Sequence, residues 1–374
     1  MGVPRQIHIA KRVVTALMFA VAMLIHTGAL AFKLQPTGTE EEVTVAALEN
    51  GTPRWLRSVT RWTIDFFSDP VHEELTNRIW GCDARPEDRQ TCVSWSGQVA
   101  PLIYGVQWND NPPFAVTSTR VPQCRLNETI RLPDRQPNCW RILFYDAKKH
   151  ARGIERYDRR SRKALIYRVH FGDMQFLHSM ASWDGESMED TKSRIMMWAE
   201  FTYKTALGEI PPTTPVNEVP VEGVKRLFSG NGYDVKILFT RGVPRYRRNI
   251  PLVAFGSLMH MIEDSFSKSH VTREPPSSTC PVILSTTKAG RVLEFHAYNR
   301  QDPDKHSDAD SRNGLEIGLI EREMIAVTVG RKLKEMFDGR QTWEVVRAYL
   351  DQCVYEVKND DLDKAAGPGR NFVR

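Results

Sequence analysis

Apolar residues recur at helical spacing over most of the chain. Windows with this period run over residues 57–80, 164–181, 187–207, 315–337 and 342–354. Repeats of three to four residues are typical of amphipathic helices, and Gly208 stands where glycine usually ends one. The pattern predicts an all-α protein with a single large helical domain.

Four segments depart from this pattern. Residues 82–142 hold four cysteines, several prolines and few periodic runs, which predicts an irregular insertion pinned by disulfides. Residues 235–239 fit either a strand or a buried helical turn, and residues 282–298 could contain a small hairpin. The polar segment 358–374 is expected to be a frayed C-terminal tail.

The stretch GSLMHMIEDSFSKSHVTR, residues 256–273, combines apolar character with candidate chemistry. It lacks proline and glycine after Gly256, so we expect one continuous buried helix. On that helix His260 and Asp264 share a face and could bind one metal ion. His270 would point away from that face, which favours a second ion beside the first. The competing interpretation is that these histidines are packed core residues.

The first 31 residues resemble an export signal. Basic residues precede an apolar run at 13–25, and Ala29-Leu30-Ala31 forms a small-x-small cleavage site. We expect cleavage after Ala31, a catalytic domain over residues 32–357, and a secreted or periplasmic protein. The alternative is an uncleaved membrane anchor. Of the net charge of +5, three charges lie in the first twelve residues. The remaining +2 or so excludes a strongly basic nucleic-acid binder on charge alone.

Six cysteines follow this segment. An even number in an exported chain predicts disulfides, although six cysteines allow fifteen pairings. The simplest set joins Cys82 to Cys92, Cys124 to Cys139 and Cys280 to Cys353. None of them has C-x2-C spacing, which argues against zinc held by thiolates.

Further histidines and carboxylates flank the central stretch, and the whole set has a characteristic order along the chain. In order, the candidate metal ligands are His72, Asp110, His178, His260, Asp264, His270, His306 and Asp310. This order resembles that of the zinc-dependent bacterial phospholipases C and the fungal single-strand-specific nucleases. The resemblance spans residues 70–310 and implies an all-helical fold with three zinc ions in one cleft.

The resemblance also implies how the ligands divide. Asp110, His178, His260 and Asp264 would hold one zinc ion, and His270, His306 and Asp310 a second. His72 and the other oxygen of Asp264 would hold a third, with the amine of Phe32 as a possible further ligand. Asp110 would also accept a proton during catalysis.

Some positions stay open. The interval between His270 and His306 is long, so His296 is an alternative ligand, although the residue four positions later is Arg300, which cannot bind a cation. His170 and Asp173 are candidates for orienting the ligands. Arg273 could reach a phosphate or be a surface charge.

The resemblance implies a secreted phospholipase C that cleaves glycerophospholipids such as phosphatidylcholine, as a monomer in transient contact with a membrane surface. The first alternative is a single-strand nuclease or 3'-nucleotidase, for which Trp108 beside Asp110 could stack against bases. Nucleic acid is a partner only in that case. The second is a non-catalytic, metal-stabilised binding protein.

Overall fold

The computed structural model describes residues 71–81, 99–151, 164–311 and 325–374, except residues 133, 231, 278 and 284–287. The expected export signal, Phe32 and the pair Cys82 and Cys92 lie outside the described residues. Within them, no helix is long and apolar enough to cross a membrane.

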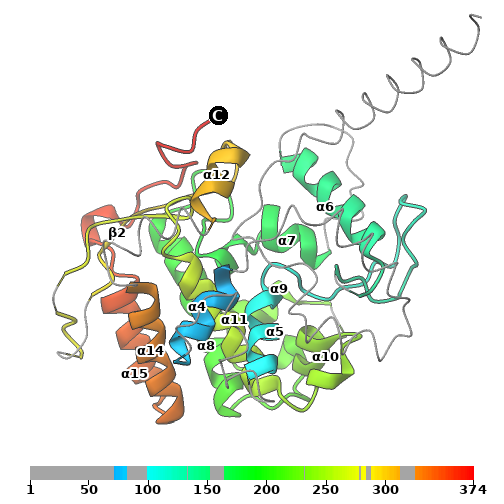
Figure 1. Cartoon of the computed structure of the whole chain (residues 1–374), viewed down its shortest axis with the longest axis horizontal. Coiled ribbons are helices and arrows are strands. Elements are labelled where there is room, and N and C mark those ends of the chain that lie inside the picture. The colour runs from blue at the N-terminus through cyan, green and yellow to red at the C-terminus, as the bar shows by residue number, and fades with distance from the viewer. Residues whose placement is uncertain are drawn as a thin grey trace, which may run out of the picture.

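Helix α11 (Ile250–Asp264) forms the centre of the protein. Every residue from Val253 to Asp264 is buried, because the helix is apolar on almost all sides and needs partners all round. The helices that pack against it include α4 (Val71–Ile79), α5 (Val99–Trp108) and α8 (Met188–Leu207), as Figure 1 shows.

Two glycines set the distance between α5 and α11. A Cβ on Gly105 would lie 2.1 Å from the carbonyl oxygen of Val253, and one on Gly256 would lie 2.2 Å from that of Leu102. The two backbones therefore touch, which only glycine permits at these positions. This contact fixes where the end of α5 lies relative to His260.

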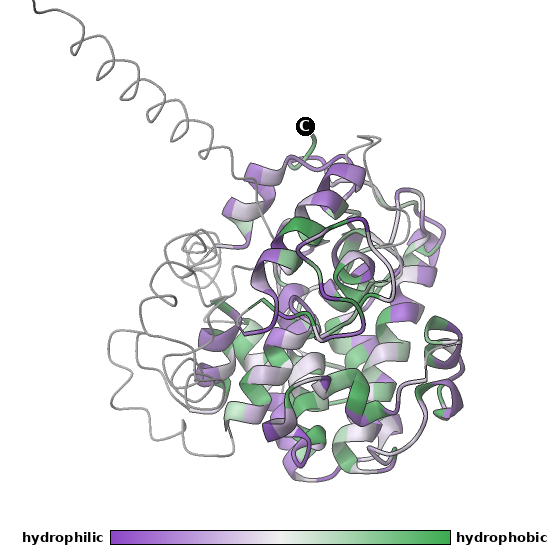
Figure 2. Cartoon of the chain, turned by 90° about the vertical axis from the view of Figure 1, so that its right-hand side faces the viewer, coloured by the Kyte–Doolittle hydropathy of each residue, from purple (hydrophilic) through white to green (hydrophobic). Residues whose placement is uncertain are grey.

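The other elements surround this centre. Helix α14 packs against α4, α15 against α8, and α6 against α7. The hydrophobic positions in Figure 2 gather where the helices face one another, and the hydrophilic ones on outer helices and loops. The bounds of these helices are α6 Pro137–Ala151, α7 Leu165–Phe171, α9 Glu222–Leu227, α10 Val235–Thr240, α12 Pro303–Ala309, α14 Ile325–Asp338 and α15 Trp343–Tyr349.

The mainly helical character that we expected is confirmed for the described residues, with one small sheet. Strand β1 (Val271–Arg273) pairs antiparallel with β2 (Val292–Phe295), with Val271 opposite Phe295. The expected hairpin within residues 282–298 is therefore only half right. That segment supplies β2, but the partner strand comes directly after the central helix.

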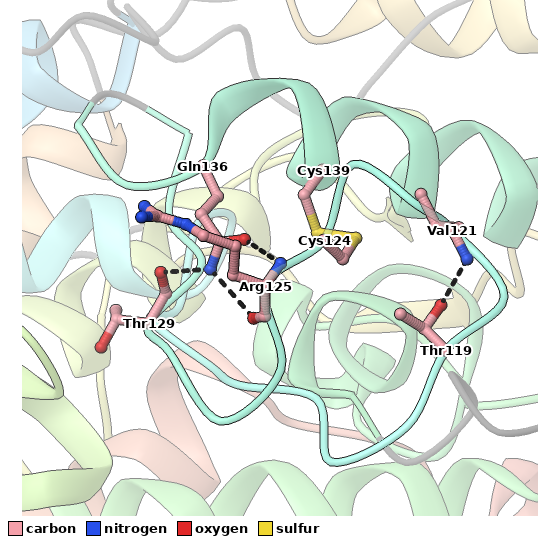
Figure 3. The surroundings of a disulfide bond; sticks show 7 residues. All are labelled: Thr119, Val121, Cys124, Arg125, Thr129, Gln136 and Cys139. Atoms are coloured by element: carbon pink, nitrogen blue, oxygen red, sulfur yellow. Dashed lines mark hydrogen bonds between the residues drawn. A yellow bond between two sulfur atoms is a disulfide. The ribbon is translucent and has the colours of Figure 1, made fainter.

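Two of the expected disulfides are present, Cys124–Cys139 and Cys280–Cys353. Figure 3 shows how the first fastens the loop before α6 to that helix. In the same loop, the Gln136 side chain accepts a hydrogen bond from Arg125 N and donates to the carbonyl oxygens of Arg125 and Thr129.

Several predicted boundaries were wrong. The region 82–142 contains α5 and the start of α6, and residues 164–181 break at Gly172 into α7 and a 3₁₀ turn, Gln175–His178. Of the two interpretations left open for residues 235–239, the helical turn is confirmed, since they belong to helix α10. The C-terminal segment is not frayed, because it bonds along its length to the body, for example Gly185 N to Ala366 O at 2.8 Å and Asp302 N to Phe372 O at 2.6 Å.

Candidate metal centre

The carboxyl end of α11 supplies the first two candidate ligands. His260 and Asp264 lie one turn apart and are fully buried, with His260 Nε2 2.9 Å from Asp264 Oδ2. This agrees with the shared face predicted from their spacing.

The helix does not continue to His270, contrary to our expectation. It ends at Asp264, and His270 lies just before β1. Serines explain the stop, since their hydroxyls bond to nearby backbone and side-chain groups in place of helical partners. Ser265 Oγ donates to Ile262 O, and Ser267 Oγ accepts from Ser269 N. The chain turns back, and His270 Nδ1 lies 3.5 Å from Asp264 Oδ1.

His178 and Asp110 complete a first group with His260. His178 Nδ1 lies 2.7 Å from Asp264 Oδ2 and 3.1 Å from His260 Nε2. The oxygens of Asp110 lie 3.7 Å from His178 Nδ1 and 3.8 Å from His260 Nε2. Asp110 follows the end of α5, so the glycine contact between α5 and α11 places it.

His270, His306 and Asp310 form a second group. Asp310 Oδ2 lies 3.0 Å from His306 Nε2 and 3.4 Å from His270 Nε2. His306 lies in α12, which Asp302 caps by accepting hydrogen bonds from Asp304 N and Lys305 N, and Asp310 directly follows that helix. The predicted spacing of four residues therefore brings both side chains to one place.

His72 joins the centre from α4. Its Nε2 lies 3.3 Å from Asp264 Oδ1, whereas His178 contacts Oδ2, and its ring stacks on that of His260 with the centroids 3.8 Å apart. His72, His260 and Asp264 are thus a third group whose donor atoms converge. All eight residues that the sequence singled out lie in these three groups, and each is almost fully buried.

Burial and mutual charge govern ionisation here. Burial lowers the pKa of His260 to about 3 and also lowers that of His178, so both rings are neutral. Burial alone would raise the pKa of Asp264, but the imidazoles of His260, His270 and His72 hold it well below its ordinary value. Neutral imidazole and ionised carboxylate are the forms that bind metal ions.

The pKa shifts of Asp110 and His270 indicate that the buried carboxylates are stabilised by positive charge. Burial raises the pKa of Asp110 well above its ordinary value. Burial opposes protonation of His270, yet Asp310 and Asp264 raise its pKa to about 9. Protons or metal ions can both supply the positive charge that these buried carboxylates need.

The donor geometry fits metal ions. Within the described residues, both carboxylate oxygens of Asp110 are buried without a hydrogen-bond partner, and so are His306 Nε2 and Asp310 Oδ2, which lie 3.0 Å apart. Tetrahedral bonds of 2.0–2.1 Å would separate donor atoms by about 3.3 Å. The distances given above within these groups, 2.9–3.8 Å, bracket that value. The three groups could therefore hold metal ions.

An outer layer of hydrogen bonds holds the ligands, and most of it was not predicted. His72 Nδ1 lies 2.7 Å from Glu263 Oε2, and Thr76 donates to the other oxygen of Glu263. Ser267 and Ser269 both donate to Asp310 Oδ1, which leaves Oδ2 facing the histidines. The only signal of this in the sequence is the serine pair just before His270.

His170 is in this layer, as expected. Its Nε2 donates to the backbone oxygen of Asp110 at 2.7 Å, since a carbonyl can only accept. Asp173 is not, because it pairs instead with Arg168 at 2.8 Å.

Three residues whose roles the sequence left open make their contacts elsewhere. His296 bonds through Nδ1 to Ser269 O and through Nε2 to Thr272 Oγ1, outside the three groups. Arg273 donates to backbone oxygens, including Ser265 O at 2.8 Å. Trp108 is fully buried in the core, and Nε1 donates to Leu238 O.

No family model matches the chain, and neither a curated protein nor a solved structure gives a match.

Proposed function

We propose that this protein is a zinc-dependent phosphodiester hydrolase, a phospholipase C that cleaves glycerophospholipids such as phosphatidylcholine. One observation carries the proposal: Oδ2 of Asp264 contacts His178 and His260, whereas Oδ1 of the same carboxylate lies near His72 and His270. A single carboxylate that serves two ligand sets is suited to a cluster of ions. Clusters of this kind act on phosphate esters.

The chemistry of the donors supports zinc. The three groups offer only imidazole nitrogens and carboxylate oxygens, which zinc binds in catalytic sites. We infer three ions, with His260 bound to only one of them: Asp110, His178, His260 and Asp264 would hold the first, His270, His306 and Asp310 the second, and His72 and the other oxygen of Asp264 the third. Bound zinc would supply a water of lowered pKa and offset the charge that develops on the phosphate.

Asp110 is the residue of this chain best placed to move a proton. Neither of its oxygens has a hydrogen-bond partner in the described part of the chain, so one can bind an ion while the other accepts a proton. His170 donates a hydrogen bond to the backbone oxygen of Asp110 and so holds the backbone from which this side chain extends.

The burial of Trp108 weighs against the nuclease alternative. Its ring packs between the aromatic residues Trp198 and Phe239, with centroids 5.8 Å and 5.2 Å away. It therefore cannot stack against a base beside Asp110. A single-strand nuclease or 3'-nucleotidase remains the second candidate, because the same ions would serve any phosphodiester.

The direct test incubates the purified protein with each of two substrates. Phosphatidylcholine vesicles should release phosphocholine, single-stranded DNA should stay intact, and Asp110→Asn should abolish the release. Nicking of DNA without headgroup release would establish the nuclease instead. Metal binding without turnover of either substrate would favour the non-catalytic protein.

We further propose that the chain is exported and acts as a monomer at a lipid surface. N-terminal sequencing of the exported protein should begin at Phe32. Recovery of the uncleaved chain in the membrane fraction would support the anchor instead.

A further inference from the structure

Gln301 is a buried polar residue with no assigned role. It lies between β2 and α12, has no solvent exposure, and its side-chain amide makes three hydrogen bonds. Nε2 lies 2.7 Å from Ser269 O and 2.8 Å from Pro368 O, and Oε1 lies 2.6 Å from His306 Nδ1. It therefore joins three parts of the chain: the turn before His270, helix α12 and the C-terminal segment.

These contacts determine the orientation of the amide. Backbone carbonyl oxygens only accept hydrogen bonds, so the group that faces Ser269 O and Pro368 O must be the NH₂ of Gln301. Both of its hydrogens are then used. Oε1 must face His306 and can only accept, so His306 Nδ1 carries a proton.

The ring of His306 is thereby fixed in one tautomer. With the proton on Nδ1, the lone pair of the neutral ring lies on Nε2, the atom 3.0 Å from Asp310 Oδ2. Nε2 is the nitrogen that faces the candidate ion. A hydrogen bond to the other ring nitrogen is the usual way in which proteins orient a histidine ligand.

The C-terminal segment holds Gln301 in turn. Ala297 N donates to Gly367 O at 2.7 Å, which fixes the chain beside Pro368. Gly369 has φ +78° and lies against the ring of His296, where a Cβ would come within 2.4 Å. His296 also donates to Ser269 O, the carbonyl that Gln301 uses.

We propose that Gln301, clamped by the C-terminal segment, is a positioning residue that fixes the tautomer and direction of His306 as a metal ligand. The inference rests on the proposed metal centre. Residues outside the ligand set would then orient His306 so that the group His270, His306 and Asp310 can bind an ion.

The test compares three variants by zinc titration against a competing chelator. Gln301→Leu removes all three hydrogen bonds. Gln301→Glu keeps an acceptor for His306 but loses both donors to carbonyls. Gln136→Leu is the matched control, because it too removes three hydrogen bonds of a glutamine, in the disulfide-pinned loop (Figure 3).

Gln301→Leu should lower the affinity for one zinc ion by about 10- to 100-fold and leave the affinities for the others at their wild-type values. Gln301→Glu should recover most of the loss, since a carboxylate accepts from Nδ1 at least as well. Gln136→Leu should bind zinc like the wild type. If Gln301 only stabilised the fold, the order of zinc affinities would be reversed, because the buried charge of Gln301→Glu would lower the affinity more than Gln301→Leu does.

Wild-type affinity in Gln301→Leu, or equal losses in the two Gln301 variants, would overturn the inference while leaving the metal centre intact. A wild-type protein that binds no zinc would overturn both. If Gln301→Leu does not fold, nitrogen-15 NMR of the zinc-loaded wild type decides. A proton on His306 Nδ1 supports the inference, and a proton on Nε2 refutes it.

Discussion

His178 Nδ1 lies 2.7 Å from Asp264 Oδ2, although 86 residues separate the two in sequence. The other oxygen, Oδ1, lies 3.3 Å from His72 Nε2. The two oxygens of one carboxylate thus face ligands from different parts of the chain. This arrangement makes Asp264 the residue on which most of the centre depends.

Asp264→Asn should therefore remove more than one zinc ion. An amide has one acceptor oxygen and no charge, so it cannot bridge two ions or offset their charge. We expect the zinc content to fall from about three ions to about one, and hydrolysis to fall at least 100-fold. Metal analysis by mass spectrometry measures the first effect. Asp173→Asn is the control, because Asp173 pairs with Arg168 away from the centre. Unchanged zinc in Asp264→Asn would refute the bridge.

Chelation should lower the melting temperature reversibly. A ligand at 100 times its dissociation constant stabilises a protein by about 2.7 kcal/mol per site. For a large domain each kcal/mol corresponds to about 2–4 °C, so removal of one ion should cost at least about 5 °C. Calorimetry with and without EDTA measures this, and added zinc, but not magnesium, should restore the original value. An identical melting temperature in EDTA would contradict a bound ion.

Gly256→Ala should disturb both the fold and the centre. The added Cβ would lie 2.2 Å from Leu102 O, so α5 and α11 must separate. We expect a loss of about 3 kcal/mol in the free energy of unfolding and weaker zinc binding, because Asp110 moves with α5. Urea titration checks the first effect.

The matched control for that change is Gly232→Ala. A Cβ on Gly232 would meet no atom of the described residues within 4 Å, so the free energy of unfolding of this variant should change by no more than about 0.5 kcal/mol. Equal stability of Gly256→Ala and Gly232→Ala would show that the two helices do not depend on close contact.

Loss of the disulfide Cys280–Cys353 should cost more than loss of Cys124–Cys139. The first spans 73 residues and the second 15, and the entropy removed from the unfolded chain grows with that span. Replacing each pair by alanine should lower the free energy of unfolding by about 4 and about 3 kcal/mol respectively. Denaturant titration under oxidising conditions tests the order, and a larger loss for Cys124–Cys139 would contradict it.

The sequence predicted those elements whose ends carry local signals. Helix α8 was recognisable because Ser187 accepts a hydrogen bond from Asp190 N at its start and Gly208 adopts φ +81° at its end. Helix α5 was missed because it is apolar on every side and has no period to recognise. The end of α11 was missed because proline and glycine were taken as the only breakers, while serines ended it.

Candidate ligands could be predicted because their side chains carry the chemistry, and their order along the chain is informative. The residues that position them could not. Gln301, Glu263 and the serine pair act through contacts with segments distant in sequence. The C-terminal segment was wrongly predicted to be frayed for the same reason. Most of its hydrogen bonds to the body join backbone atoms, which its amino-acid composition does not reveal.

The clamp on Gln301 has a consequence for the order of assembly. Pro368 is synthesised after α4, α5 and α11, which can pack before it appears. A nascent chain can therefore gather seven of the eight candidate ligands while His306 still turns freely. Under the proposed function, hydrolysis would then begin only when Pro368 and its neighbours dock beside Gln301.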